Sequence, residues 1–377
     1  MDRDELAAWL RLDGTPGVGN QNARRLLAAF GLPQAVFQAS PQALAEVAGP
    51  TVAAALAQAP DGFEALLATT WKWLNHADAD SAPRAVVTLA DPHFPASLLA
   101  IEDPPLLLYL LGQPLPAPDV ACIAIVGTRN PTPQGMDDAH SFGAHFAASG
   151  IVVVSGLAQG IDGAAHTGAL DGAGDATGRC TTVAFVGTGL DRVYPSRHRA
   201  LAHRIAGSGT LVSEYPLGTP PLPHNFPRRN RLIAGLSLGT LVVEATQPSG
   251  SLITARVAAE QGKDVFAVPG SIHAPQSRGC HALIRQGAKL VESAQDVLEE
   301  LRLPVGASSA STHDDGAGAA DSHPLLDAMG HAPVSVDALV ARTGLDAAQI
   351  QVQLLELELD GRVARLTGGL MQRLASA

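Results

Sequence analysis

The densest group of residues suited to binding a polyanion is the run HNFPRRNRLI at positions 224–233. Three arginines follow Phe226 within this run. Arginine pairs with phosphate and stacks on bases, and an aromatic ring offers a further stacking face. The run therefore predicts a nucleic-acid contact by Phe226, Arg228, Arg229, Asn230 and Arg231. The alternative is that one arginine caps or forms a salt bridge and that Phe226 belongs to a core.

A second group consists of turns rich in small residues, each of which follows a short apolar run. The turns contain Gly127, Thr128 and Arg129; Ser155, Gly156 and Gly160; residues 187–189; and Ser249, Gly250, Ser251 and Thr254. Such turns expose backbone N–H groups that hold phosphate together with a following helix N-terminus. One turn is common in this kind of fold, but four predict a ligand with several phosphates, such as a polynucleotide.

The elements that must position these turns alternate between strands and helices. Short apolar runs occupy residues 122–126, 151–154, 182–186, 210–212, 240–243 and 265–268. Continuous apolar strands that alternate with helices indicate a parallel sheet covered on both faces. We therefore expect an α/β fold, a Rossmann-like doubly wound, mostly parallel sheet over residues 120–302, with the turns gathered at one edge.

The segments before this sheet predict a small helical domain and a connector. Residues 1–80 show helical spacing and fit a helix-hairpin-helix or SAM-like domain. Gly17 and Gly19 flank Val18 at the entry to a helix, which is the pattern of a duplex phosphate contact and equally of a helical packing module. Residues 81–119 are rich in proline and predict an extended connector.

The segments after the sheet predict a linker and a second module. Residues 303–322 have low complexity and no apolar periodicity, as expected of a flexible linker. Residues 323–377 predict a winged helix with helices at 324–329, 336–343 and 347–360. Its wing would have two strands joined at Gly368 and Gly369.

Charge distinguishes the two candidate nucleic-acid surfaces. The chain has 377 residues and a net charge of −11, yet residues 127–231 contain nine arginines against seven acidic residues. The basic charge is thus concentrated at the predicted edge. The winged helix has four arginines against six acidic residues. Because a duplex reader needs a basic face, its composition favours contact with a protein over contact with DNA.

Several kinds of site have no counterpart in the sequence. A GxGxxG fingerprint, a P-loop, a nucleophile elbow and nuclease-type metal spacing are all missing. Asp162 and His166 are an i, i+4 pair that could act as acid and base. Because no nucleophile accompanies them, we expect them to order the turn through hydrogen bonds. Scattered cysteines, an acidic N-terminal sequence and short apolar runs predict a cytoplasmic protein without metal or membrane contact.

The ordered motifs resemble those of the DNA-processing protein A family (DprA, also called Smf) of bacterial natural transformation. They are AIVGTR (124–129), VSGLAQGID (154–162) with His166, VGTGL (186–190) with Tyr194 and Pro195, FPRRNR (226–231) with Ile233 and GLS (235–237), VVEA (242–245), GSLITA (250–255), AVPG (267–270), and GCH (279–281) with Leu283, Ile284, Gly287 and Ala288. The matching segments extend over about 170 residues. The helical N-terminal domain and the winged helix also agree with this family.

The resemblance implies a protein that binds single-stranded DNA, protects incoming strands and loads RecA recombinase on them. It implies a homodimer formed through the Rossmann-like domain, no established catalytic activity and no cofactor. Carried over by motif, the DNA pocket falls on Arg129, Ser155, Gly156, Gly160, Phe226, Arg229 and Arg231, with the 249–254 segment completing the edge. The family commonly has a lysine near this pocket; here an arginine or His224 must supply that charge.

Two alternatives remain at the level of sequence. A nucleotide phosphoribohydrolase with a Rossmann-like fold would carry a PGGxGTxxE run, which aligns loosely with residues 248–254, but the second glycine is shifted and the glutamate is missing. The other alternative is a protein-interaction adaptor dominated by the winged helix.

Overall fold

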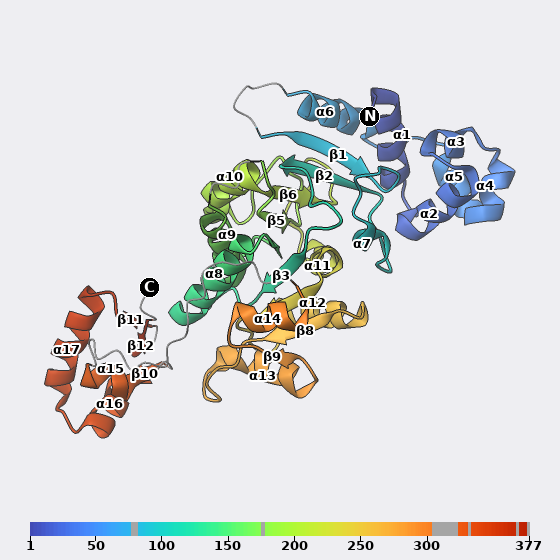
Figure 1. The fold of residues 1–377 in the computed structure, drawn as a ribbon. Helices are drawn as coiled ribbons and strands as arrows, with labels where there is room; N and C mark the ends of the chain where they lie inside the picture. Colours follow the sequence, from blue (N-terminus) through green and yellow to red (C-terminus); the bar gives the residue numbers. More distant parts are fainter. Residues whose placement is uncertain (77–81, 175–177, 304–322, 331–332, 367–368, 375–377) are drawn as a thin grey trace.

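The computed structural model describes residues 1–76, 82–174, 178–303, 323–330, 333–366 and 369–374 (Figure 1). Its centre is a nine-stranded sheet in the order β1-β2-β6-β5-β4-β3-β7-β8-β9. The strands are β1 (Arg84–Thr88), β2 (Leu107–Gly112), β3 (Cys122–Val126), β4 (Val152–Ser155), β5 (Thr182–Phe185), β6 (Thr210–Ser213), β7 (Gly239–Val242), β8 (Asp264–Ala267) and β9 (Lys289–Leu290). Strands β3 to β9 pair in parallel, whereas β1–β2 and β2–β6 pair antiparallel.

The parallel part of the sheet confirms the sequence prediction. The six apolar runs form β3 to β8. No strand boundary differs from its predicted position by more than one residue. All residues of β3, β4, β5, β6 and β7 are buried. Such strands need no polar alternation because helices cover both faces of the sheet.

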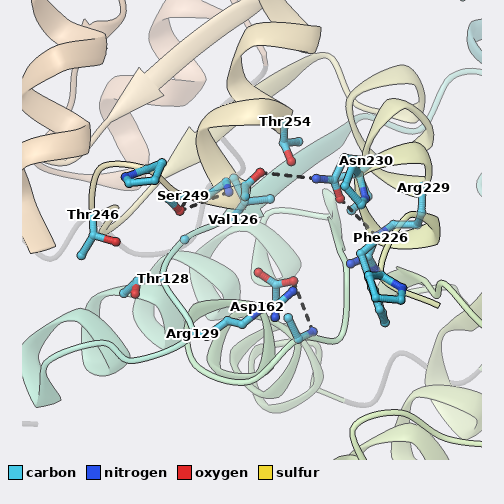
Figure 2. Close-up of a pocket in the computed structure, with 18 of the residues that line it drawn as sticks. Val126, Thr128, Arg129, Asp162, Phe226, Arg229, Asn230, Thr246, Ser249 and Thr254 are labelled. Atoms are coloured by element: carbon cyan, nitrogen blue, oxygen red, sulfur yellow. Dashed lines mark hydrogen bonds between the residues drawn. The ribbon is translucent and has the colours of Figure 1, made fainter. Parts of the chain in front are cut away.

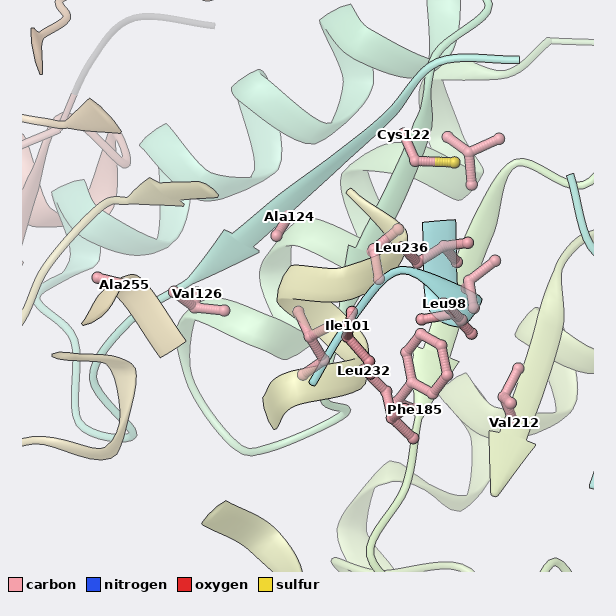
Figure 3. Packing of buried hydrophobic residues seen from close by; sticks show 14 of the residues in the cluster. Leu98, Ile101, Cys122, Ala124, Val126, Phe185, Val212, Leu232, Leu236 and Ala255 are labelled. Carbon is pink, nitrogen blue, oxygen red and sulfur yellow. The ribbon is translucent and has the colours of Figure 1, made fainter. Parts of the chain in front are cut away.

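Successive residues of β3 face two different hydrophobic cores, as the pleat of a strand requires. Ile123 and Ile125 pack with residues of α8 (Pro133–Ala148), α9 (Ile161–Gly172) and α14 (Ala294–Glu300). Ala124 and Val126 belong to the opposite core, which includes residues of α7 (Ala96–Leu99), α11 (Asn225–Leu236), α12 (Gly250–Glu260) and α13 (Arg278–Arg285) (Figure 3). The sheet is therefore covered on both sides, and α11 and α12 lie on the same face.

The prediction of an extended connector over residues 81–119 is wrong. This segment contributes β1, α7 and β2, and β2 joins the sheet beside β6. The apolar residues Leu107, Leu108 and Tyr109 are buried in β2. The prolines lie outside the two strands, in the loops around them, so they remove no N–H group from the ladder.

The N-terminal segment, residues 3–74, consists of six helices and the turns that join them. Its helices are α1 (Arg3–Gly14), α2 (Gly19–Phe30), α3 (Pro33–Gln38), α4 (Pro41–Ala48), α5 (Pro50–Leu56) and α6 (Phe63–Leu74). Helix α1 packs against the antiparallel edge of the sheet, since Leu6 and Trp9 share a core with Val86 and Tyr109. No helix among the described residues is both long and apolar enough to cross a bilayer.

The C-terminal module has the elements of a winged helix. It contains α15 (Pro324–Met329), α16 (Val336–Thr343) and α17 (Ala347–Leu359), and β10 (Val334–Ser335), β11 (Val363–Arg365) and β12 (Leu370–Arg373) form a sheet in the order β10-β12-β11. These elements enclose their own apolar core, which includes Leu339 and Leu354. Gly368 of the predicted wing turn and residues 304–322 of the predicted linker lie outside the described residues.

Candidate nucleic-acid interface

A cavity of about 580 Å³ opens where the strand order of the sheet reverses. Strand β3 pairs with β4 on one side and β7 on the other, and doubly wound sheets bind ligands outside the carboxyl ends of strands at such a point. The lining comes from the loops after β3, β4 and β7 and from α11 and α12. It includes Gly127, Thr128, Arg129, Phe226, Arg229, Asn230, Ser249, Gly250, Ser251 and Thr254 from the predicted site (Figure 2).

The turn after β3 lies directly on the start of α9. A Cβ atom on Gly127 would lie 2.4 Å from the Ile161 side chain, so only glycine allows this approach. Gly160 has a φ of +81°, and a Cβ there would lie 2.4 Å from the carbonyl oxygen of Thr128. Gly160 thus packs against the turn after β3 and is not among the residues that line the cavity. The close packing leaves Arg129 exposed at the cavity, without an ion pair to any described residue.

Asp162 organises the turn after β4. One of its carboxylate oxygens accepts hydrogen bonds from the N–H groups of Gly156 (3.1 Å) and Ala158 (3.3 Å), which confirms the expected structural role. Burial raises the pKa of Asp162, while the Arg229 guanidinium and these N–H groups oppose that rise. Ser155 is fully buried and donates to the Ile125 carbonyl, so it holds β4 against β3 and does not reach the cavity.

His166 is likewise a buried structural group. Its Nδ1 lies 2.7 Å from the hydroxyl of Thr182, which itself donates to the carbonyl of Val153. The hydroxyl therefore accepts from His166, which places the ring proton on Nδ1. Burial lowers the pKa of His166 to about 3, and the positive charges nearby act in the same direction. A neutral histidine thus joins α9 to β5.

Arg229 both holds the fold together and lines the cavity. Its side chain is buried and donates to the carbonyl oxygens of Gly156 and Phe185. Burial lowers the pKa of Arg229 to about 10, although Asp162 opposes the change. The guanidinium therefore remains charged at neutral pH, and it lines the cavity.

Two aromatic rings form one wall of the site. The guanidinium groups of Arg129 and Arg229 each lie 6.0 Å from the centroid of the Phe226 ring. The Tyr194 ring lies 5.5 Å from Phe226, tilted by 39°, and the tyrosine is 47% exposed. A smaller hollow of about 150 Å³ is lined by Gly156 together with these four side chains. The sequence analysis assigned Tyr194 no role in the site; its position just after the third glycine turn was the signal that could have found it.

Helices α11 and α12 close the other side of the cavity. Asn230 of α11 donates to the backbone carbonyl of Gly250 at 3.4 Å. The Ser249 hydroxyl accepts from the Ser251 N–H at 3.3 Å and caps α12. The FPRRNR run and the predicted 249–254 turn, which are about 20 residues apart in sequence, are thereby joined at one edge.

Arg231 does not reach the cavity, contrary to its predicted role as a DNA contact. Its guanidinium pairs with Glu214 and, at 3.3 Å, with Asp103, and its side chain is only 13% exposed. Arg228 is half-exposed, lies 3.6 Å from Glu214 and is also outside the cavity. Residues of an α-helix are rotated by about 100° each, so Phe226 and Arg229 share a face that excludes Arg228 and Arg231.

The turn between α1 and α2 has the expected hairpin geometry. Gly17 and Gly19 have φ angles of +80° and +56°, and both are exposed. The next residue, Asn20, is buried and donates to the Glu214 carboxylate at 3.3 Å. This hairpin is therefore joined to the face of α11 that points away from the cavity, and its predicted duplex contact stays a prediction.

The family model described as DNA recombination-mediator protein A matches residues 85–302, more than half of the chain. The chain belongs to this family. A second model, the DprA winged helix domain, matches residues 307–369. The first match begins within β1, in agreement with the strands found in the predicted connector. The resemblance stated from the sequence motifs is thus confirmed.

Relatives in the DprA family extend over most of the chain. Protein Smf of Escherichia coli K12 is 43% identical over 283 residues, which cover 73% of this chain and 74% of that protein. The X-ray structure of DprA from Streptococcus pneumoniae is 35% identical with a TM-score of 0.64 and covers 80% of this chain and 98% of its own. A structure of the Helicobacter pylori protein, reported for its single-stranded DNA binding mode, is 28% identical with a TM-score of 0.52 and covers 58% and 95%.

Proposed function

We propose that the chain binds single-stranded DNA at the cavity between β3, α11 and α12. One observation carries the proposal: Arg129 and Arg229 flank the Phe226 ring at 6.0 Å beside several small-residue turns. This arrangement offers a stacking surface and two fixed positive charges. The binding mode reported for the Helicobacter pylori relative supports the same choice of ligand.

The proposed binding divides between backbone and side chains. Backbone N–H groups of the turns at Gly127 and Gly250 hold phosphates, and Arg129 adds a charge-assisted contact. Phe226 stacks on a base, with Tyr194 beside it. Because every base has an aromatic face, such binding tolerates any sequence and falls steeply as salt rises.

The family resemblance extends the proposal to a cellular role. We propose that the protein protects incoming single strands in the cytoplasm and loads RecA recombinase on them during natural transformation. A homodimer formed through the Rossmann-like domain would place two cavities on one strand and raise affinity through effective concentration. The activity proposed is binding, with no catalytic step.

Comparing single-stranded with duplex DNA under increasing salt tests the binding proposal. Oligo-dT should bind more tightly than a duplex of equal length, and Arg129→Ala should weaken oligo-dT binding at least tenfold, about 1.4 kcal/mol. Arg278→Ala is the matched control, because Arg278 is exposed at the start of α13 and outside the cavity. Equal affinity of the wild type for duplex and single strand, or unchanged binding by Arg129→Ala, would refute the proposal.

A separate observation favours a protein partner for the winged helix. Val352, Leu355 and Leu359 of α17 are 58%, 53% and 80% exposed and recur at helical spacing. Helix α17 contains no basic residue. We propose that this apolar stripe contacts a protein. Deleting residues 323–377 should then change oligo-dT affinity less than threefold; a collapse of affinity with the sheet still folded would place the DNA site on the winged helix.

A further inference from the structure

The segment after Tyr194 carries positive charge that the proposed cavity does not use. Residues 192–213 contain four arginines and no acidic residue. Two of these arginines are occupied: Arg192 pairs with Asp191 at 2.8 Å, and Arg204 pairs with Asp171 at 2.5 Å. Arg197 and Arg199 are exposed and form no ion pair with any residue that the structure describes. These two guanidinium groups are available to a ligand.

Their position does not serve the stability of the fold. Arg197 lies in the 3₁₀ turn η1 (Ser196–His198), and Arg199 is the first residue of α10 (Arg199–Ser208). Positive charge at the N-terminus of a helix opposes the helix dipole. Two unpaired arginines at this place are better explained by a negatively charged partner outside the chain.

A cavity of about 510 Å³ lies beside these charges. Leu157, Val186 and Leu190 are buried apolar residues of its lining, and Ser196, Arg199 and His203 are polar ones. Arginine pairs with phosphate and its planar guanidinium stacks on aromatic rings such as a base, and the aliphatic lining beside Arg199 offers the base an apolar contact.

The acidic residue at this cavity is already neutralised. One Asp191 oxygen accepts from the Gly218 N–H at 2.7 Å, and the other pairs with Arg192. Burial opposes the charge of Asp191, but these contacts outweigh it and hold its pKa below the usual value. The carboxylate is therefore satisfied within the fold and leaves the charge of Arg199 uncompensated.

This cavity adjoins the proposed DNA site through two shared loops. Tyr194 and Pro195 line the smaller hollow at Phe226, whereas the neighbouring Val193 and Ser196 line the second cavity. In the same way Leu157 lines the second cavity while the residues on either side of it line the first hollow. The three residues from Tyr194 to Arg197 can span at most about 11 Å. A strand in contact with Tyr194 therefore needs little length to reach Arg197.

We propose that the cavity at Arg199 is a second subsite for the same single strand, which leaves the first site past Tyr194. A phosphate would pair with Arg197 or Arg199, and a base would rest on the apolar lining. This inference depends on the proposed function of the first site. It assigns a role to residues that neither the motif analysis nor the first cavity includes.

Oligonucleotide length separates the two subsites experimentally. The double variant Arg197→Gln/Arg199→Gln is compared with wild type on oligo-dT of about 4 and about 16 nucleotides, the lower and upper ends of the usual range of single-strand site sizes. The long oligomer should bind about tenfold more weakly to the variant. The plot of log affinity against log salt should be shallower by about 0.7, the contribution of one lost phosphate contact on a single strand. The short oligomer should bind unchanged.

Arg204→Gln is the matched control, because it removes the same charge from the same helix where the guanidinium is already paired with Asp171. It should leave both oligomers unaffected. Unchanged binding of the long oligomer by the double variant, or an equal loss for both lengths, would overturn the second subsite while leaving the first intact. Failure of the wild type to bind either oligomer would overturn the proposed function itself. Thermal unfolding of each variant verifies that the fold is retained.

Discussion

Helix α11 has arginine on two of its faces, and the two arginines have different kinds of partner. On one face Arg229 donates to two backbone carbonyl groups, which orient its guanidinium, and it forms no ion pair with a described residue, although the Asp162 carboxylate is near enough to raise its pKa. On the other face Arg231 pairs with the buried carboxylate of Glu214. The guanidinium of Arg229 lies 6.0 Å from the centroid of the Phe226 ring at the cavity. Arg231 instead pairs with Glu214, which also accepts a hydrogen bond from Asn20 of the N-terminal helix α2.

The different partners of Arg229 and Arg231 show that the arginines of one run need not act as one binding unit. The partner of each guanidinium decides whether its charge is available: neutral carbonyls leave it available to a phosphate, and a carboxylate removes it. The opposite face of α11 is therefore expected to support stability, while the cavity face supports binding. The following four experiments test that division, from the largest expected effect to the smallest.

Arg231→Ala should mainly destabilise the fold. The substitution leaves the Glu214 carboxylate buried without its main partner, and breaking a buried pair costs about 3–5 kcal/mol. Because Asn20 and Arg228 remain close to Glu214, we expect the free energy of unfolding to fall by about 3 kcal/mol, the lower end of that range. Urea unfolding measures this loss. Replacing both partners, as Glu214→Gln/Arg231→Met, should recover part of it. Weaker oligo-dT binding without a loss of stability would contradict the division.

Phe226→Ala should mainly weaken binding. Base stacking on an aromatic side chain is worth roughly 1–3 kcal/mol, which corresponds to about fivefold to 160-fold in oligo-dT affinity. Fluorescence anisotropy at fixed salt measures the change, and Phe226→Tyr, which keeps a ring, is the control. If the alanine variant bound as tightly as the wild type, the aromatic wall would have no part in binding.

Low pH should destabilise the fold through the buried side chain of His166. Its folded-state pKa of about 3 lies below the ordinary value of 6.5, so below pH 6.5 the unfolded chain binds a proton that the folded chain does not. Stability therefore falls as pH falls, by about 2 kcal/mol between pH 7 and pH 5. Denaturant unfolding at both pH values should show this dependence, and His166→Gln should reduce it. An equal pH dependence in both proteins would exclude His166 as its source.

Arg228→Ala should have the smallest effect. Its half-exposed guanidinium lies 3.6 Å from Glu214, and exposed ion pairs contribute roughly 0–1 kcal/mol. The equilibrium constants for unfolding and for oligo-dT binding should each change less than about fivefold. A tenfold loss of affinity would show that the DNA path extends over this face of α11.

Local pattern predicted much of the site because its main parts follow strand ends. The apolar run of β3 predicted where Arg129 would lie, and the strand-end rule brought it to the same edge as the 249–254 turn. The pattern failed for β2, where nearby prolines concealed a buried strand. It also missed Tyr194, because a loop residue has no periodicity to reveal which way it faces.

Apolar runs and turn residues were enough to predict the parallel strands, the covering helices and the edge at which the glycine turns meet. These features depend on hydrophobic periodicity and backbone freedom, which are properties of short segments. Only the tertiary structure decided which charges remain available. Glu214 lies 17 residues before Arg231, and Asn20 lies 194 residues before Glu214, yet the three side chains meet around one carboxylate. Electrostatic partners are chosen by distance in space, which no local pattern records.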